Sequence, residues 1–256
     1  IKGGRRLEAA AHAGTIVTLI LSDVVGNRLD IVASGPTMPD ASTFADALDV
    51  LDDHDLAGAS PNVTALLERG RSGDIAETPA GGPGFERQVV CLVGDAATAA
   101  RAAAEAAEVV GIPAEVVSTT LTGEARDVAR QIISAAPANP GMAIYAGETT
   151  VTVTGTGRGG RNQELALAAG IALGGIDDVV VASVGTDGRD GLTDAAGAFG
   201  DGGTVARAAA VGLDAAACLA DNDSNRLLEA TGDLVITGPT GTNVGDLVVV
   251  YRSQPA

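Results

Sequence analysis

The segment 155–164, with the sequence GTGRGGRNQE, combines four glycines and two arginines directly before an apolar stretch of helical length. A glycine-rich turn at a helix N-terminus offers free backbone N–H groups and the positive end of the helix dipole to an anion. Arginine adds planar, permanently charged donors that suit phosphate or carboxylate. The sequence therefore predicts an anion site at Arg158, Gly159, Gly160, Arg161 and Asn162. The alternative is a flexible hairpin loop with solvated arginines.

A second glycine-rich segment, 186–198, follows an apolar run of strand length and holds three carboxylates within eight residues, Asp187, Asp190 and Asp194. Closely spaced carboxylates suit a hard divalent cation such as Mg²⁺, or supply a base for a substrate hydroxyl. An EF-hand is excluded, because the bidentate glutamate at the end of such a loop is absent. The alternative is a solvated acidic turn, in keeping with the acidity of the whole chain.

Small polar side chains follow other predicted strands. Segment 238–247 offers neutral donors of the kind that hold phosphate oxygens or a sugar-like hydroxyl, namely Thr240, Thr242 and Asn243. The first predicted strand is followed by Ser22, Asp23, Ser34, Gly35 and Thr37. Taken singly, each turn is ordinary turn chemistry. Ligands of open α/β sheets bind at the carboxyl ends of strands, so several such ends in one chain favour a binding site.

Several familiar site types lack the residues that they need. A Walker A loop requires a lysine after its glycines, and the chain has no lysine beyond Lys2. Residues 155–160 satisfy the G-x-G-x-x-G pattern only loosely and do not predict a dinucleotide site by themselves. The two cysteines and two histidines are isolated, which argues against zinc chemistry, a Ser-His-Asp triad and a Cys-His pair.

The elements that must position these residues alternate between strands and helices, which predicts an α/β fold with a mostly parallel or mixed sheet and flanking helices. Strands are expected at 15–21, 88–93, 114–117, 142–146, 150–154, 179–184, 234–237 and 247–251. Helices are expected at 43–51, 62–69, 96–110, 124–136, 163–172, 203–210, 214–219 and 224–230. Ser42 and Asp95 are the expected N-caps of the first and third of these helices. A domain boundary is expected in the glycine- and proline-rich stretch 70–86.

Composition limits the partners. The 256 residues are 46% hydrophobic and 19% charged, as in globular proteins, and no apolar run is long enough for a membrane span. A net charge of −17 argues against nucleic acid, whose phosphates are bound by clustered lysine and arginine. The sparse cysteines make a reduced, cytoplasmic setting the expectation. The oligomeric state stays open, with a homodimer as one alternative.

The chain resembles the glycerate 2-kinase family whose C-terminal region is called the MOFRL domain. The resemblance lies in five stretches in the family's order, IKGGRRL, LILSDVVGNRLDIVASGPTMPDASTFADAL, GETTVTVTGTGRGGRNQELALA, GTDGRDGLTDAAGA and TGPTGTNVGDLVV. It implies a two-domain α/β architecture, with residues 1–86 as the remainder of an incomplete N-terminal Rossmann-like domain. Residues 87–256 are then the MOFRL-type domain.

The resemblance also implies an activity, the transfer of the γ-phosphoryl group of ATP to D-glycerate with a divalent metal. Arg161 and Asp187 are then the expected catalytic residues, and Asp187 and Asp190 the expected metal ligands. The remaining polar residues named above are expected to bind glycerate or the phosphates. The family's long section before IKGG is not in this sequence, so these 256 residues are expected to be inactive, or at best to bind ligands weakly. Two alternatives stay open: a non-catalytic small-molecule or nucleotide-binding module, and, less favoured, a hydroxypyruvate reductase.

Overall fold

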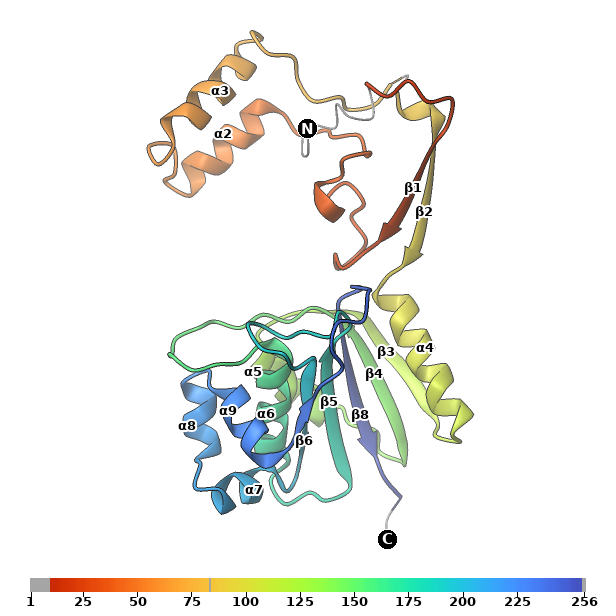
Figure 1. Cartoon of the computed structure of the whole chain (residues 1–256), viewed down its shortest axis with the longest axis vertical. Coiled ribbons are helices and arrows are strands. Elements are labelled where there is room, and N and C mark those ends of the chain that lie inside the picture. Colours follow the sequence, from red (N-terminus) through yellow and green to blue (C-terminus); the bar gives the residue numbers. More distant parts are fainter. Residues whose placement is uncertain (1–9, 83, 255–256) are drawn as a thin grey trace. The chain divides into compact units, whose positions relative to one another are not determined.

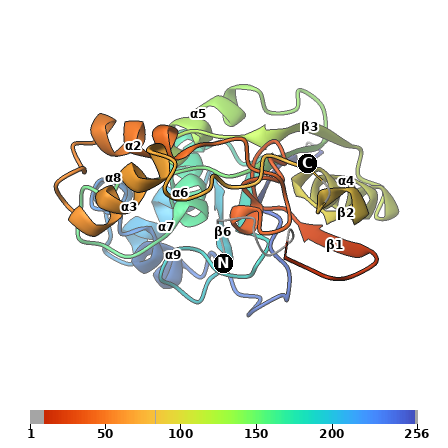
Figure 2. The ribbon, with the colours of Figure 1, turned by 90° about the horizontal axis from the view of Figure 1, so that it is seen from above.

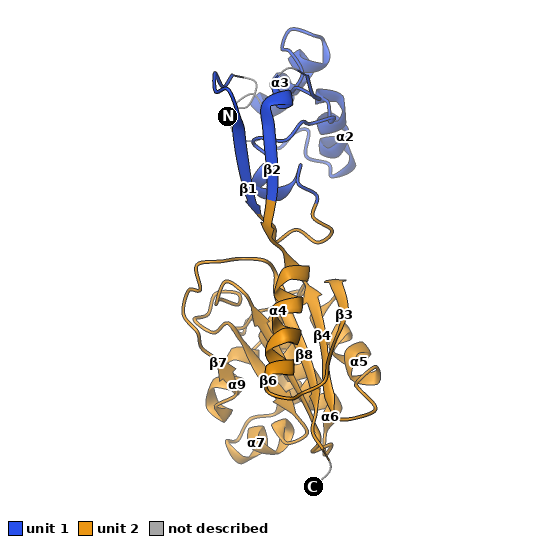
Figure 3. Ribbon diagram, turned by 90° about the vertical axis from the view of Figure 1, so that its right-hand side faces the viewer, with its two compact units in different colours: residues 1–20, 28–91 blue, residues 21–27, 92–256 orange. Residues whose placement is uncertain are grey.

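The computed structural model describes residues 10–82 and 84–254. Lys2 and the first stretch of the family resemblance lie outside the described residues. The chain divides into two compact units, one comprising residues 1–20 and 28–91 and the other residues 21–27 and 92–256 (Figure 3). The expected boundary between residues 86 and 87 stays a prediction about the family's domains.

The smaller unit contains a two-stranded sheet and two helices. Strands β1 (Ile16–Leu21) and β2 (Gln88–Gly94) pair with each other, and their last residues belong to the larger unit. Helix α2 (Phe44–Asp53) starts with a capping box between Thr43 and Asp46, so its cap is one residue later than expected. Helix α3 (Pro61–Arg71) begins at a proline, whose fixed φ suits the first turn. Short 3₁₀ turns, η1 (Val32–Ser34) and η2 (Phe85–Arg87), complete the unit.

The larger unit is built on a six-stranded sheet in the order β3-β4-β8-β5-β6-β7 (Figure 1). The strands are β3 (Ala114–Leu121), β4 (Gly141–Gly147), β5 (Val179–Gly185), β6 (Gly197–Asp201), β7 (Leu234–Val235) and β8 (Asp246–Arg252). Only β3 and β4 pair in parallel, and every other neighbouring pair of this sheet is antiparallel. The expectation of a mostly parallel or mixed sheet is confirmed in its mixed form.

Helices cover both faces of this sheet. They are α4 (Ala96–Val109), α5 (Ala125–Ser134), α6 (Arg161–Leu173), α7 (Thr204–Ala210), α8 (Ala215–Ala220) and α9 (Ser224–Thr231). Successive residues of a strand point to opposite faces. In β8, Val248 and Val250 pack with α5 and α6, whereas Leu247 and Val249 pack with α4. Helices α7, α8 and α9 form a further core against α6, on the side of the sheet opposite α4 (Figure 2).

Helix α6 is surrounded by protein, because it lies between the sheet and the α7–α9 layer. Ten of its residues, beginning with Asn162, are buried. Close packing depends on two glycines: a Cβ on Gly170 would lie 2.5 Å from Thr204 Oγ1, and one on Gly200 would lie 2.0 Å from the Ala166 carbonyl oxygen. The helix is therefore held rigidly, and its N-terminus has a fixed place at the sheet edge.

The carboxyl ends of β4 and β5 meet at one edge of the sheet. Both strands pair antiparallel with β8, so they run in the same direction and β8 begins where they end. Asp246, the first residue of β8, is in register with Gly147 on one side and Gly185 on the other. The loops that follow β4 and β5, and the segment that leads into β8, therefore lie at a common edge.

Residues 150–154 do not form the expected strand. A single bridge joins Thr150 to Glu124, after which side chains rather than a neighbouring strand take up the backbone N–H groups. The Glu124 carboxylate accepts from the N–H of Thr152, and the Asn222 amide oxygen accepts from those of Thr154 and Gly155. The alternating valines and threonines thus give an extended segment without a strand partner.

Strand β6 was not expected from the sequence, because GAFGD has no apolar alternation. Its glycines are required by contact instead, since a Cβ on Gly197 would lie 1.8 Å from the Ser183 carbonyl oxygen. Strand β7 is shorter than expected and ends at Val235. The Asp95 cap of α4 is confirmed, as its carboxylate accepts from the N–H of Thr98.

Candidate active site

The first turn of α6 is the centre of the candidate site. Its four consecutive residues each contact a different part of the larger unit, because side chains in one helical turn radiate in all directions. Arg161 reaches β8, Asn162 reaches β5, Gln163 reaches the loop after β5, and Glu164 reaches α5. The sequence RNQE therefore ties four elements to one helix N-terminus.

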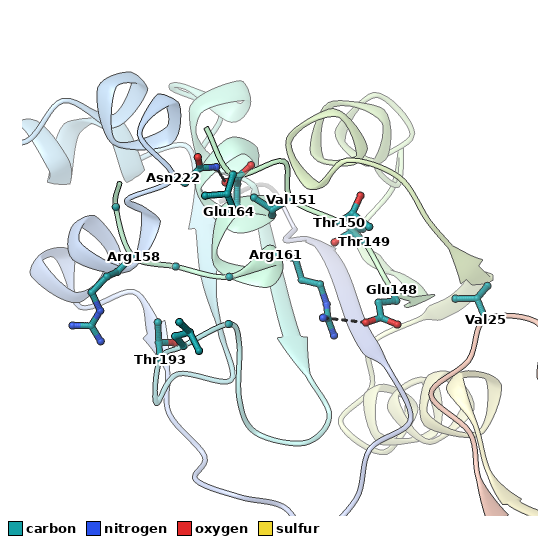
Figure 4. A pocket seen from close by; sticks show the side chains of 16 residues that line it. Val25, Glu148, Thr149, Thr150, Val151, Arg158, Arg161, Glu164, Thr193 and Asn222 are labelled. Carbon is teal, nitrogen blue, oxygen red and sulfur yellow. Dashed lines mark hydrogen bonds and ion pairs between the residues drawn. The ribbon is translucent and has the colours of Figure 1, made fainter. Parts of the chain in front are cut away.

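Arg161 lies between two carboxylates at the sheet edge. Its guanidinium donates from Nε and Nη2 to both oxygens of Asp246, at 2.6 and 3.0 Å, and its Nη1 lies 3.0 Å from Glu148 Oε1 (Figure 4). These hydrogen bonds to Asp246, followed by the charges of Asp246, Glu148 and Asp190, raise the pKa of Arg161. The side chain keeps about a third of its surface exposed. It is a fixed cation that a ligand can reach.

Glu148 directly follows β4 and is the more accessible partner of Arg161. Burial raises the pKa of this carboxyl, and the negative charges of Asp246 and Asp23 act in the same direction, while Arg161 opposes them. Asp246, in contrast, is buried and accepts from two guanidinium nitrogens, Nε and Nη2. Glu148 is therefore the carboxylate of this pair that is open to a substrate.

The glycine-rich turn before α6 uses its backbone in two ways. The N–H groups of residues 154–158 all donate to oxygens of the segment Asp221, Asn222 and Asp223. The N–H groups of Gly159, Gly160 and Arg161 meet no hydrogen-bond acceptor among the described residues. The second group is therefore available to a bound anion.

The four glycines are needed for close approach rather than for unusual dihedral angles. A Cβ at Gly155 would lie 2.2 Å from the Asp221 carbonyl oxygen, and one at Gly157 would lie 2.4 Å from Asp223 Cβ. A Cβ at Gly159 would lie 2.2 Å from Ser224 Oγ, a buried hydroxyl that has no hydrogen-bond partner in the described part of the chain. The turn is thus pressed against the segment that leads into α9.

Asp190 is the buried N-terminal cap of α6. Its Oδ1 accepts from the N–H and side-chain amide of Asn162, at 3.1 and 3.3 Å, and its Oδ2 accepts from the N–H and amide of Gln163, both at 2.9 Å. Burial raises the pKa of Asp190, while the N–H groups of Gln163 and Asn162 act against that shift. Its carboxylate is fully engaged with the helix.

Asn162 was expected to bind phosphate and Asp190 to bind metal, and the structure gives both side chains other partners. The Asn162 amide oxygen accepts from Ser183 Oγ at 2.6 Å while its nitrogen donates to Asp190. Neither residue lines the cavity at this site. The ligand-binding roles of these two residues stay predictions, and the observed contacts favour a positioning role.

A cavity of about 700 Å³ opens beside the helix N-terminus. Two stretches of chain, 148–151 and 157–161, form its sides, and Val153, Gly191, Leu192 and Thr193 extend it. Figure 4 shows Arg158 and Arg161 on the glycine-rich side and Val151 on the other. Glu164 and Asn222 also line the cavity, as does Val25. Its lining therefore combines an anion-accepting turn with valine and leucine side chains.

Glu164 is a buried carboxylate in this cavity with two partners. Arg126 lies 2.7 Å from its Oε1, and the Asn222 amide donates to its Oε2 at 2.9 Å. A buried carboxylate requires such partners, because removing one charged group from water costs on the order of several kcal/mol. Glu164 thus offers a fixed acceptor to donors on a bound ligand.

Thr240 and Thr242 line a different cavity of about 640 Å³, next to α4. Thr240 Oγ1 donates to the Thr186 carbonyl oxygen at 2.5 Å. The structure therefore does not bring these two threonines into the Arg161 cavity. Most of the residues around the second cavity are alanines, valines and leucines, so it lacks the cationic donors of the first.

Other expected site residues fall into two groups. In the larger unit, Asn243 donates to Asp23 at 2.9 Å, and Ser22 is buried with its hydroxyl 3.4 Å from the Val24 carbonyl oxygen. Asp187 accepts from the N–H of Arg189 and lines neither cavity. In the smaller unit lie Ser34, Gly35 and Thr37. Their expected roles stay predictions.

Sequence reasoning missed Glu148, Glu164 and Asp246. Glu148 and Asp246 each border a predicted strand at the sheet edge, and that position was the available signal. Nothing in the sequence indicates that Glu164 pairs with Arg126, because they are 38 positions apart. Within residues 10–82 and 84–254, no group of three or more histidine, cysteine, aspartate or glutamate side chains could hold a metal ion.

Comparison with known proteins assigns the chain to a family. Residues 141–246 match the MOFRL family, and residues 1–68 match a domain of unknown function, DUF4147. The chain is 34% identical to a glycerate kinase of Macaca fascicularis, over 98% of its own length and 75% of that protein. The chain belongs to the glycerate kinase family.

Two further relatives and one crystal structure also match nearly the whole of this chain but only part of their own length. The chain is 43% identical to the D-glycerate 2-kinase of Thermotoga maritima, over 97% of its own length and 59% of that protein. A crystal structure of a glycerate kinase from the same organism is 42% identical and superposes with a TM-score of 0.84, covering 98% of this chain and 60% of that one. A relative from Agrobacterium vitis, 37% identical over 96% of this chain and 57% of that protein, is named a putative hydroxypyruvate reductase. The chain thus spans less than two thirds of the length of these three proteins.

Proposed function

We propose that this chain forms part of the active site of a D-glycerate 2-kinase, which transfers the γ-phosphoryl group of ATP to the 2-hydroxyl of D-glycerate. One observation carries the proposal. The Arg161 guanidinium lies at the same helix N-terminus as the backbone N–H groups of residues 159–161, which lack acceptors among the described residues. Phosphoryl transfer depends on positioning and on charge neutralisation more than on covalent chemistry by the protein. A fixed cation beside oriented N–H groups supplies both.

Arg161, with the N–H groups of Gly159 and Gly160, is the proposed holder of the transferring phosphate oxygens. Arg158, exposed at the same turn, adds a second positive charge. Glu148 is the proposed acceptor of the proton from the glycerate hydroxyl, because it lies beside Arg161 and its pKa is raised. Asp187 stays an alternative for that role. The hydroxyl oxygen then attacks phosphorus while ADP leaves.

Divalent metal is proposed to enter with the nucleotide. Mg²⁺ is usually held by one or two carboxylates together with substrate phosphates, and there it neutralises the charge that develops on the phosphate oxygens. Asp187 fits such a role, because the one hydrogen bond that its carboxylate accepts from the described residues comes from the Arg189 N–H of the same loop. Asp190 does not fit, because four donors occupy its oxygens.

The finer expectations about the protein are part of the same proposal. We place it in the cytoplasm with glycerate and ATP as small-molecule partners, without nucleic acid or membrane, and with a homodimer as one alternative. No helix in the described part of the chain has the length and apolar character to cross a bilayer. Because the chain spans 59% of the Thermotoga kinase, we propose that these 256 residues alone bind ligands without completing the transfer.

A turnover assay tests the proposed reaction. The longest form of the protein is incubated with D-glycerate and MgATP, and formation of ADP and 2-phosphoglycerate is followed. Oxidation of NADH or NADPH with hydroxypyruvate is measured in parallel. ATP-dependent phosphorylation without nicotinamide turnover is expected. Nicotinamide-dependent turnover alone would replace the kinase with the reductase, and neither activity would leave a binding module.

A further inference from the structure

Two apolar residues of the Arg161 cavity are held out toward solvent. Leu192 is 97% exposed and Val153 is 73% exposed, although both line the cavity. The loop that carries Leu192 is firmly fixed, because Asp190 and Thr193 on either side of it are buried and hydrogen bonded. Because both side chains line the cavity, a ligand that fills it would cover them and remove their apolar surface from water.

The cavity is larger and more apolar than glycerate requires. Its volume of about 700 Å³ lies within the range of sites that take whole drug-sized molecules. D-glycerate is a three-carbon acid without an apolar surface that would match Val151, Val153 and Leu192. A ligand that fills this space has an anionic end for the glycine-rich turn and a flat, largely apolar end for the valines.

The buried Glu164 carboxylate also lines the cavity and favours a ligand that carries hydrogen-bond donors. Arg126 and Asn222 hold it in place, and it lines the cavity. Carboxylates that accept from ribose hydroxyls are a recurring feature of nucleotide sites. A nucleoside polyphosphate carries all three groups: phosphates, ribose hydroxyls and a base.

We propose that this cavity binds the adenine nucleotide, with its phosphates at Gly159–Arg161, its ribose near Glu164 and its base against Val153 and Leu192. The inference rests on the proposed kinase function, and it assigns one of the two substrates to this cavity. D-glycerate then approaches from the Glu148 side of Arg161. The larger unit carries all the residues that line the nucleotide site.

Binding measurements on the full 256-residue chain test the assignment without requiring turnover. The chain is titrated with ADP and, separately, with D-glycerate by calorimetry, and two variants, Val153→Glu and Leu192→Glu, are compared with it. Each variant replaces an exposed apolar contact with a carboxylate that faces the bound nucleotide. We expect the Kd for ADP to rise roughly tenfold in each, from lost apolar contact. Val109→Glu is the matched control, because this valine of α4 is 86% exposed, between the values for Val153 and Leu192, and lines neither cavity described above.

The outcomes separate this assignment from the reaction itself. Weaker ADP binding in the Val153 and Leu192 variants, with Val109→Glu unchanged, supports the nucleotide site. Three results would overturn it. Both variants could bind ADP as tightly as the unmodified chain, or they could lose affinity for glycerate but not for ADP. The unmodified chain could also show no saturable binding of ADP. ATP-dependent phosphorylation of glycerate by the longest form of the protein would stand in each of those cases, so the kinase proposal fails only in its own assay.

Discussion

Removing the Asp190 carboxylate should destabilise the larger unit far more than removal of an ordinary helix cap. Asp190 is 2% exposed and accepts four hydrogen bonds from Asn162 and Gln163. A hydrogen bond to a charged group contributes about 1.5–3 kcal/mol, and a buried donor left without a partner costs about 1–3 kcal/mol. Water that enters the vacated space recovers part of this loss. We expect Asp190→Ala to lower the free energy of unfolding by about 3–4 kcal/mol.

Asp214→Ala is the matched control for this experiment. Asp214 caps α8 through one hydrogen bond, to the N–H of Ala217, and it is exposed. Loss of such a cap costs about 1 kcal/mol. The chain has no tryptophan, and its two tyrosines, Tyr145 and Tyr251, lie on β4 and β8. Tyrosine fluorescence during urea unfolding therefore reports on the six-stranded sheet rather than on the smaller unit.

The result that would refute the capping role is a loss for Asp190→Ala no larger than that for Asp214→Ala. Asp190→Asn separates capping from metal binding in magnesium-free buffer. If Asp190 caps the helix, this variant is also destabilised, because the new amide nitrogen faces two N–H donors. If Asp190 is a metal ligand, removal of its unpaired charge leaves stability unchanged or higher, and a magnesium-dependent gain is lost.

Two further predictions concern the turn and the acidic partner of Arg161. Gly157→Ala places a Cβ 2.4 Å from Asp223 Cβ and should cost about 2–3 kcal/mol of unfolding free energy, whereas Gly58→Ala, with open space around it, should change little. Because the folded pKa of Glu148 is raised above its ordinary value of 4.5, its contribution to stability is present below that value and lost as pH rises through the folded pKa. The free energy of unfolding of Glu148→Gln should therefore rise relative to that of the unmodified chain as pH increases above 4.5. A constant difference between the two free energies across this pH range would contradict the prediction.

The sequence allowed the α/β class and the position of the anion-accepting turn to be predicted, because both follow from local patterns. Apolar runs and caps such as Asp95 mark most elements of the larger unit. The segment 150–154 shows the limit of this reasoning. Its alternation is that of a strand, but the acceptors that meet its N–H groups come from Glu124 and Asn222, and no local rule reveals them.

The roles of individual charged residues were less accessible, because they depend on pairing between distant parts of the chain. Asp190 has the same local setting as Asp187, a glycine-rich loop after β5, yet one carboxylate is buried under α6 and the other is not. Asp246 precedes an apolar run and looks like a turn residue. Its place between β4 and β5, opposite Arg161, follows only from the antiparallel insertion of β8.

The central claim, that Arg161 holds the transferring phosphate, is tested most directly by kcat for ATP-dependent phosphorylation of D-glycerate in the longest active form of the protein. Arg161→Ala is combined with Asp246→Asn in one double variant, so that no buried carboxylate is left without its partner. Tyrosine fluorescence verifies that this variant is folded. Arg130→Ala, at an exposed arginine of α5, is the control. We expect kcat to fall by on the order of 10²-fold or more in the Arg161 variant, with Arg130→Ala unchanged. A folded Arg161 variant with near-normal kcat would contradict the claim.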